Sequence, residues 1–354
     1  MEYIIGILIL ASFFGLAVYA ARGGNLMMGM LIMAILWTIL PMTGNLLASN
    51  PEFIAANGDS IRITWIQAFS KVFQSGPEGW GSVLVNVVFG AWFGRVLLET
   101  GIAATLIRKT TELGGDKPAI TCILLCIVTA AIFSSLFGAG AVVAISVIIL
   151  PIFMSLGIPK VLSVVSFMLS IGAGMFLNPV LFGQYTAFFL DGDGKVLYPY
   201  EQYVKWGGIA LAVQLVFIII LILFCMRKKS VHSWAARRPV RRKLDFAPTP
   251  SLLTPFIPVF LLIVFKVPII MGFLIGGFYA LFVCGKLKSF RAACRTFNKD
   301  FFDGVVDTAP LVGFLLVVPM FNKAAELCIP YFNALLGNII PHSTLFITVI
   351  FCVL

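Results

Sequence analysis

Long apolar runs, separated by short polar segments, recur along almost the whole chain. Each run approaches the roughly 20 apolar residues that an α-helix needs to cross a bilayer. The runs lie at 3–21, 25–47, 82–107, 119–137, 141–157, 161–190, 205–226, 252–265, 267–284, 303–321 and 334–354. This pattern predicts an all-α polytopic membrane protein with about ten membrane segments.

Composition supports the membrane class. Of the 354 residues, 60% are hydrophobic and 11% are charged, and the mean hydropathy is +1.04, which is far from the composition of a soluble domain. The first run opens with Glu2 rather than with basic residues, and no small-residue cleavage site follows it. We therefore expect a retained helix rather than a signal peptide.

The basic residues are unevenly distributed. The formal net charge is +10, and a dense cluster of Lys and Arg lies between positions 227 and 243. Under the positive-inside rule this cluster predicts a cytoplasmic loop at 227–251 that faces the lipid bilayer surface, and it does not indicate nucleic acid. Counting helices back from this loop places the segment 191–201 and the amino terminus outside. The expected location is the inner (plasma) membrane.

The two halves of the chain repeat one order of elements with opposite orientation. Each half has a pair of apolar helices, then an amphipathic segment (61–73 or 285–300), then a further helix. This order is typical of inverted-repeat secondary transporters. It predicts a first repeat at 1–204, a connecting membrane helix at 205–226, the basic loop at 227–251 and a second repeat at 252–354. Within the first repeat we expect scaffold helices at 3–47, a helix at 82–107, a re-entrant hairpin at 119–157 and a broken helix at 161–190.

Serine and glycine interrupt the predicted hairpin, in the stretch "SSLFGAGAVV" at 134–143. Non-helical backbone is tolerated at membrane depth only where it is buried in protein or lines a watery cavity. We therefore expect a hairpin tip, at Ser134, Ser135, Gly138 and Gly140, whose free backbone groups bind an ion or a substrate.

A second break is predicted in "SIGAGMFLNPVLFGQYTAFF" at 170–189. Pro179 removes a backbone donor and disfavours helix at Asn178, which predicts an interruption near mid-membrane. Two breaks in neighbouring segments predict one binding site, in which Ser and Asn coordinate the substrate or ion and glycines permit close backbone approach. Its members are Ser134, Ser135, Gly138, Gly140, Gly172, Gly174, Asn178, Pro179, Gln184 and Thr186. The alternative interpretation is that these small residues serve helix packing.

The segments around the breaks resemble a group of known carriers. "LIRKTTELGGDKPAI" (106–120), "LFGAGAVVAISVIILPIFMSLGIPKVLSVV" (136–165) and "LNP" (177–179) are similar to the ion-transporter superfamily, and within it to the citrate and gluconate permease-like families. The resemblance implies inverted repeats, hairpins with binding residues at their tips, and uptake of a small organic anion of the citrate, gluconate or dicarboxylate class. It also implies coupling to H⁺ or Na⁺ as the only cofactor, and an elevator motion in a homodimer.

The chain departs from this family in two respects. The Ser-Asn-Thr tip motif of the Na⁺-coupled dicarboxylate branch is absent, so H⁺ and Na⁺ both stay open as coupling ions. The chain also stops at Leu354, within the expected first arm of a second hairpin, which predicts an incomplete second repeat. A truncated, non-transporting paralogue or subunit is therefore one alternative function. A Na⁺/H⁺ antiporter of the same superfamily is another, but it needs a buried carboxylate where the breaks meet, and none lies within 134–190.

Ionisable residues within the apolar runs are given structural roles. Arg95 and Glu99, spaced i, i+4, are expected to pair with each other. Asp303 and Asp307 are expected to begin a helix, because the helix dipole favours carboxylates at that end.

An enzyme is not expected. The only histidines, His232 and His342, have no metal-binding or acid–base companion at useful spacing. The seven cysteines show neither metal-site spacing nor a disulfide framework. We therefore predict no catalytic residue and no metal.

Overall fold

The computed structural model describes residues 2–48, 50–115, 117–186, 196–226, 247–287 and 289–337, and the regular elements of this part of the chain are helices. Five of them are long and apolar enough to cross a membrane, or six if the bent pair α10 and α11 counts as one span. These lengths and compositions are those of a multi-pass membrane protein. The five are α1 (Glu2–Ala21), α2 (Leu26–Leu47), the helical run Trp65–Glu99, α12 (Tyr200–Met226) and α15 (Phe290–Leu336).

The run Trp65–Glu99 is assembled from α4 (Trp65–Ser70), a π-helical turn (Lys71–Ser75), α5 (Gly76–Glu78) and α6 (Gly81–Glu99). The other helices are α3 (Pro51–Ile61), α7 (Ile102–Gly114), α8 (Pro118–Phe133), α9 (Ala139–Ser155), α10 (Lys160–Met175), α11 (Pro179–Thr186), the 3₁₀ helix η2 (Thr249–Phe256), α13 (Ile257–Val264) and α14 (Ile269–Val283). The predicted basic cluster at 227–243 and most of the last apolar run lie outside the described residues.

The chain divides into two compact units, of which the first comprises Met1–Gly81 and Val312–Leu354 and the second Ser82–Leu311. In the first unit α1 packs on α2, as expected for the scaffold helices at 3–47. The turn between them uses Gly23, whose φ of 82° suits glycine, and the side chain of Asn25 caps α2 by accepting a hydrogen bond from the Met28 amide.

The core of the first unit also contains the carboxyl-terminal part of α15. The Trp37 ring stacks on Phe321 with centroids 5.0 Å apart, and its indole N–H donates to the Ser12 hydroxyl at 2.8 Å. Pro41 inside α2 has no N–H to donate to the carbonyl one turn earlier, at Trp37. The thiol of Cys328 donates to that carbonyl at 3.5 Å, so the proline leaves no orphaned acceptor there.

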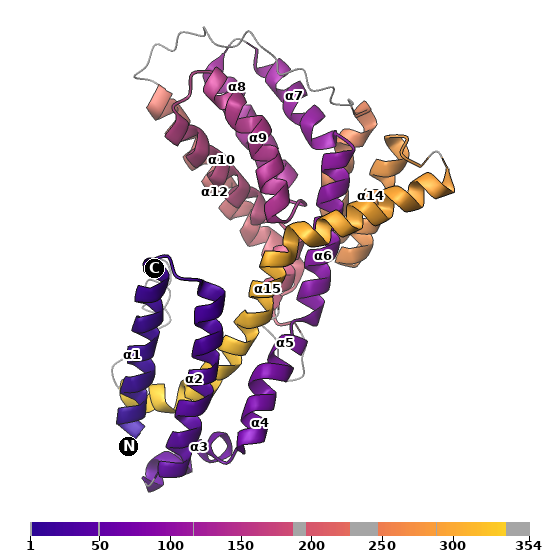
Figure 1. The fold of residues 1–354 in the computed structure, drawn as a ribbon. Coiled ribbons are helices and arrows are strands. Elements are labelled where there is room, and N and C mark those ends of the chain that lie inside the picture. The colour runs from indigo at the N-terminus through magenta and orange to yellow at the C-terminus, as the bar shows by residue number, and fades with distance from the viewer. Residues whose placement is uncertain are drawn as a thin grey trace. The chain divides into compact units, whose positions relative to one another are not determined.

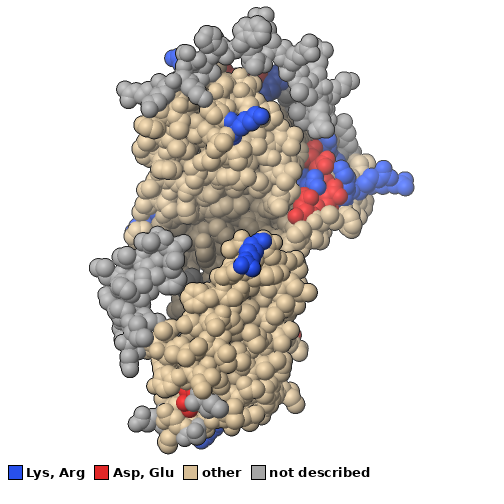
Figure 2. Space-filling view, turned by 60° about the vertical axis from the view of Figure 1, so that its left-hand side comes forward, with Lys and Arg blue, Asp and Glu red and all other residues tan. Residues whose placement is uncertain are grey.

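In the second unit α8, α10 and α12 pack against one another, and α9 packs on α10 (Figure 1). Large apolar side chains along α12 are exposed, among them Val213 at 65% and Phe224 at 68%. The face drawn in Figure 2 carries few charged residues among the described ones. Exposed apolar helix surface with few charges is suited to contact with lipid tails rather than water.

The apolar span 82–107, predicted as one helix, is two helices. The chain turns at Gly101, which has a φ of 73°, between the end of α6 and the start of α7. Beyond this turn α7 is amphipathic, and Arg108 forms an exposed ion pair with Glu112 one turn later. A left-handed glycine and a switch to an amphipathic pattern therefore end the span at Glu99.

The amphipathic segments at 61–73 and 285–300 are not separate from the helices that follow them. The helix that begins at Trp65 continues without a long break to Glu99, and α15 begins at Phe290 and runs to Leu336. Asp303 and Asp307 therefore lie inside α15 rather than at a helix start, and the prediction that they cap a helix is wrong.

Candidate functional site

The first predicted break is present between α8 and α9. Helix α8 ends at Phe133, α9 begins at Ala139, and Gly138 between them has a φ of 112° that suits only glycine. Helix α9 leads by four residues into α10, whose far end returns to the end of α8 (Figure 1). Helices α8 and α9 are therefore antiparallel arms, and the break at 134–138 forms their tip.

The second predicted break is also present. Helix α10 ends at Met175, α11 begins at Pro179, and the two helices are bent by 63°. The Asn178 amide N–H groups donate to the carbonyls of Phe133 at 2.9 Å and Leu136 at 3.0 Å, which belong to the first break. Its Oδ1 accepts from the Val180 amide at 2.9 Å and so caps α11. Asn178, which is fully buried, therefore links the two breaks to each other by hydrogen bonds.

The two predicted serines of the tip are buried and hydrogen-bonded within the protein. Ser134 donates to the Ala131 carbonyl at 2.8 Å, one turn back in α8. Ser135 donates to the carbonyl of Pro255 in η2 and so connects the tip to the second half of the chain. This connection across the sequence could not be found from local pattern.

The predicted glycines of α10 lie at close helix contacts. A β-carbon at Gly174 would lie 2.3 Å from the Ala130 carbonyl oxygen of α8, and one at Gly172 would lie 3.0 Å from Nε2 of Gln214 in α12. Both observations favour the packing interpretation for these two positions.

Gln184 and Thr186 belong to α11, further along from the break. The Gln184 Nε2 is buried without a hydrogen-bond partner, and Thr186 donates to the Gly183 carbonyl at 2.8 Å. Thr186 also lines an aromatic cavity of about 470 Å³ with Tyr185, Tyr203 and Trp206. In the described part of the chain, neither side chain is hydrogen-bonded to the hairpin tip.

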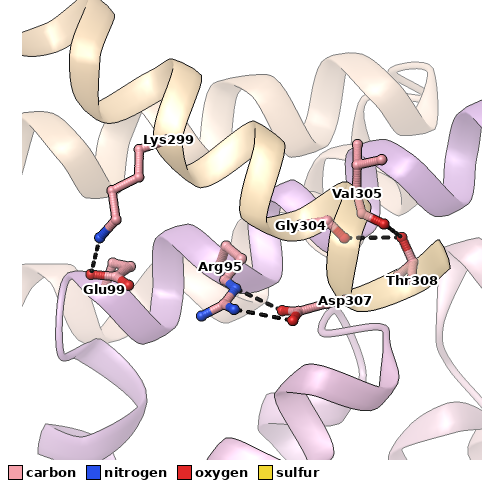
Figure 3. A network of polar contacts seen from close by, with 7 residues as sticks. All are labelled: Arg95, Glu99, Lys299, Gly304, Val305, Asp307 and Thr308. Carbon is pink, nitrogen blue, oxygen red and sulfur yellow. Dashed lines mark hydrogen bonds and ion pairs between the residues drawn. The ribbon is translucent and has the colours of Figure 1, made fainter.

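An ion pair that sequence reasoning missed lies against the tip. Arg95 of α6 donates from Nη2 to Oδ1 of Asp307 in α15 at 3.0 Å, and its Nε lies 2.6 Å from Oδ2 without hydrogen-bond alignment (Figure 3). The side chains are 27% and 20% exposed, so the pair is partly accessible. The expected pair of Arg95 with Glu99 is wrong, because Glu99 instead pairs with Lys299 at 3.3 Å.

The tip glycines bring the hairpin into contact with this pair. A β-carbon at Gly140 would lie 2.3 Å from Cγ and Oδ2 of Asp307, and one at Gly138 would lie 3.2 Å from the Thr308 methyl group. The hydroxyl of Thr308 is hydrogen-bonded within α15, since it donates to the Gly304 carbonyl one turn earlier at 2.9 Å (Figure 3). Gly304 in turn lets α15 approach α6 closely, because its β-carbon would lie 2.9 Å from the Trp92 backbone nitrogen.

The arrangement places opposite charges and free backbone donors together. Asp307 lies beside the first turn of α9, whose amide N–H groups have no intrahelical acceptors and carry the positive end of the helix dipole. Arg95 adds a full positive charge with a planar set of donors. Such a site is suited to bind a carboxylate or a similar anion.

The fold is that of a multi-pass helical membrane protein. Asn178 joins its two helix breaks, and the first break lies against the ion pair of Arg95 and Asp307. Comparison of the chain with models of protein families, with curated proteins and with solved structures finds no match.

Proposed function

We propose that the protein is a secondary active transporter of a small organic anion of the citrate, gluconate or dicarboxylate class, coupled to H⁺ or Na⁺. The observation that carries this proposal is the meeting of two helix breaks beside Arg95. In carriers built from broken helices, half-helix amino termini and backbone groups at the breaks face the anionic substrate and its coupling ion. Here the start of α9 and the Arg95 guanidinium meet at one carboxylate.

The proposed architecture is an inverted repeat of about ten membrane segments. The long helices supply five or six of them, and the shorter apolar helices Pro118–Phe133, Ala139–Ser155, Thr249–Val264 and Ile269–Val283 supply the remainder. The short length of α8 and α9 suits a re-entrant hairpin that does not cross the bilayer. The proposed orientation has the amino terminus outside and the loop 227–251 in the cytoplasm of a plasma-membrane protein.

A buried carboxylate next to the ion pairs is the candidate for binding the coupling ion. Asp300 of α15 is 1% exposed, and its Oδ2 has no hydrogen-bond partner. It neighbours Lys299, whose ammonium group is paired with Glu99. Placing a carboxylate inside the membrane costs free energy, and such carboxylates commonly mark sites that bind a cation or a proton.

The test is uptake by the purified full chain in proteoliposomes. Radiolabelled citrate, gluconate and succinate are offered separately, each with an imposed proton gradient or an imposed Na⁺ gradient. Saturable, gradient-driven uptake of one acid supports the proposal. Absence of uptake for all three under both gradients would contradict it.

A second candidate function is cation/proton exchange, and the position of Asp307 supports it. That class needs a carboxylate where the breaks meet, and α15 places Asp307 against Gly140 at that position. The same proteoliposomes, loaded with a pH-sensitive dye, distinguish the two functions. Na⁺-driven proton movement without uptake of any acid would favour exchange, whereas acid uptake favours the anion carrier.

A further inference from the structure

The carboxylate of Asp307 occupies a place that has the features of a carboxylate-binding site, which we call the receptor. Arg95 approaches it with two nitrogen atoms, at 3.0 Å and 2.6 Å, and the first turn of α9 lies against it at Gly140. Guanidinium groups and helix amino termini both bind carboxylates and phosphates in proteins. The two oxygen atoms that Arg95 contacts also lie next to the β-carbon position of Gly140, in the first turn of α9.

Two glycines of the hairpin tip, Gly138 and Gly140, leave space for a carboxylate at this position. With no β-carbon at residue 140, the Asp307 carboxylate comes close to the α9 backbone. Gly138 takes a backbone conformation that turns the chain into α9, and its neighbour across the contact is only the methyl group of Thr308. A free carboxylate of similar size can therefore take the place of the Asp307 carboxylate beside the first turn of α9.

The pair is less buried than the groups that hold the tip together. Arg95 and Asp307 side chains are 27% and 20% exposed, whereas Ser135 and Asn178 are fully buried. Only the contact between Nη2 and Oδ1 has hydrogen-bond alignment, and Nε lacks an aligned acceptor. An accessible and imperfectly satisfied pair can exchange one carboxylate for another at lower cost than a buried, fully bonded pair.

We propose that Arg95 and the first turn of α9 form the subsite for a carboxylate group of the transported anion, and that Asp307 is an internal counter-ion occupying this subsite until the anion displaces it. The identity of the anion as a transported substrate rests on the proposed function. The receptor itself does not, because it is defined by contacts within the second unit.

Displacement makes two variants behave in opposite ways. Removing the Arg95 guanidinium removes the receptor and abolishes anion binding. Removing the Asp307 carboxylate removes the competitor, so a free carboxylate then binds more tightly, by about tenfold if Asp307 occupies the subsite about 90% of the time. A purely structural ion pair predicts the same loss of stability from both changes and no gain of binding from either.

The experiment uses the full chain in detergent with Asp307→Ala, which leaves space for a small carboxylate. The melting temperature is measured in sodium acetate and in sodium chloride at equal ionic strength. We expect acetate to raise the melting temperature of the variant by about 2–4 °C more than chloride does, and to have no such effect on the unmodified protein. If Asp307→Ala is not monodisperse, Asp307→Ser serves in its place.

Two controls identify the receptor. The double variant Arg95→Gln with Asp307→Ala is expected to lose the acetate effect. Glu99→Ala, which breaks the second ion pair between the same two helices, is expected not to gain one. Equal melting temperatures in acetate and chloride for the Asp307 variant would overturn the inference, and so would an acetate effect that survives loss of Arg95.

Uptake measurements separate this inference from the proposed function. If the unmodified protein transports an acid, Asp307→Asn is expected to lower the half-saturating concentration for its binding about tenfold. If no acid is transported but the acetate effect is present, the proposed function fails while the carboxylate subsite stands. Transport of an acid with unchanged binding in both Arg95→Gln and Asp307→Asn would overturn the subsite alone.

Discussion

The carboxylate carbon of Asp307 lies 2.3 Å from the position that a β-carbon on residue 140 would occupy. Such a distance is impossible between real atoms, so any residue other than glycine at 140 must displace Asp307 or the hairpin tip. The contact joins α15 to the tip and lies next to the ion pair with Arg95.

Gly140→Ala is therefore expected to break the ion pair between Arg95 and Asp307 and to destabilise the fold by about 1–3 kcal/mol, the usual effect of overpacking. Thermal unfolding in detergent measures the loss, and anion uptake measures its effect on the site. Gly15→Ala is the matched control, since nothing lies within 4 Å of a β-carbon at that helical position. Equal stability of the two variants would show that the tip is not packed on Asp307.

Asn178→Ala removes three hydrogen bonds at a fully buried side chain. The carbonyls of Phe133 and Leu136 lose their donors, and the unfolding free energy is expected to fall by about 2–4 kcal/mol. Thermal unfolding measures this effect. Asn178→Asp, which keeps the acceptor for the Val180 amide but not the donors, separates the cap from the link between the breaks. A variant that keeps its stability but binds anion more weakly would instead support the prediction that Asn178 contacts the substrate.

Two adjacent glycines of α12 are expected to differ in their tolerance of substitution. A β-carbon at Gly207 would lie 2.2 Å from the carbonyl oxygen of Phe176, at the second break, whereas nothing lies within 4 Å of one at Gly208. Gly207→Ala should destabilise the protein by about 1–3 kcal/mol. Gly208→Ala should be neutral or stabilising by up to about 1 kcal/mol, because alanine favours helix. Similar melting temperatures for the two would contradict the close packing of α12 on the break.

Both helix breaks could be predicted because their causes are local. Glycine at 138 permits a backbone conformation that other residues avoid, and Pro179 disfavours helix at Asn178. The structure ends α8 five residues before Gly138 and α10 three residues before Asn178. The scaffold helices α1 and α2 were predictable for a similar reason, since their length and apolar composition need no partner.

The charged part of the candidate site could not be predicted in this way. Arg95 and Asp307 are separated by 212 residues, and Arg95 has a nearer acidic residue, Glu99, at the spacing that favours a pair on one helix. Only the packing of α6 on α15 at Gly304 brings the distant carboxylate closer. The available signal was that charges within apolar runs are functional candidates by default. Pairing Arg95 with Glu99 and giving Asp307 a helix-capping role concealed it.

The start of α15 was misplaced for a related reason. Residues 290–302 carry charges on an amphipathic pattern, which indicates a surface helix, and an apolar run follows. The structure continues one helix through both segments, from Phe290 to Leu336. Pattern alone does not reveal whether a change from amphipathic to apolar sequence includes a break, because the single glycine at this junction, Gly304, is compatible with a continuous helix.

Asp300→Asn tests which group binds the coupling ion. The substitution keeps the shape of a side chain that is 1% exposed but removes its ability to carry a charge or to take up a proton. If Asp300 binds the coupling ion, the variant should still bind the transported acid but should lose the acceleration of uptake by an imposed proton or Na⁺ gradient. Asp303→Asn, one turn further along α15 and less buried, is the matched control and should retain gradient-driven uptake.

Exchange of labelled acid without a gradient measures substrate binding and movement separately from coupling. Gradient-driven uptake of unchanged size in Asp300→Asn would exclude Asp300 as the coupling residue. It would direct attention to Asp307, the α15 carboxylate that is paired with Arg95.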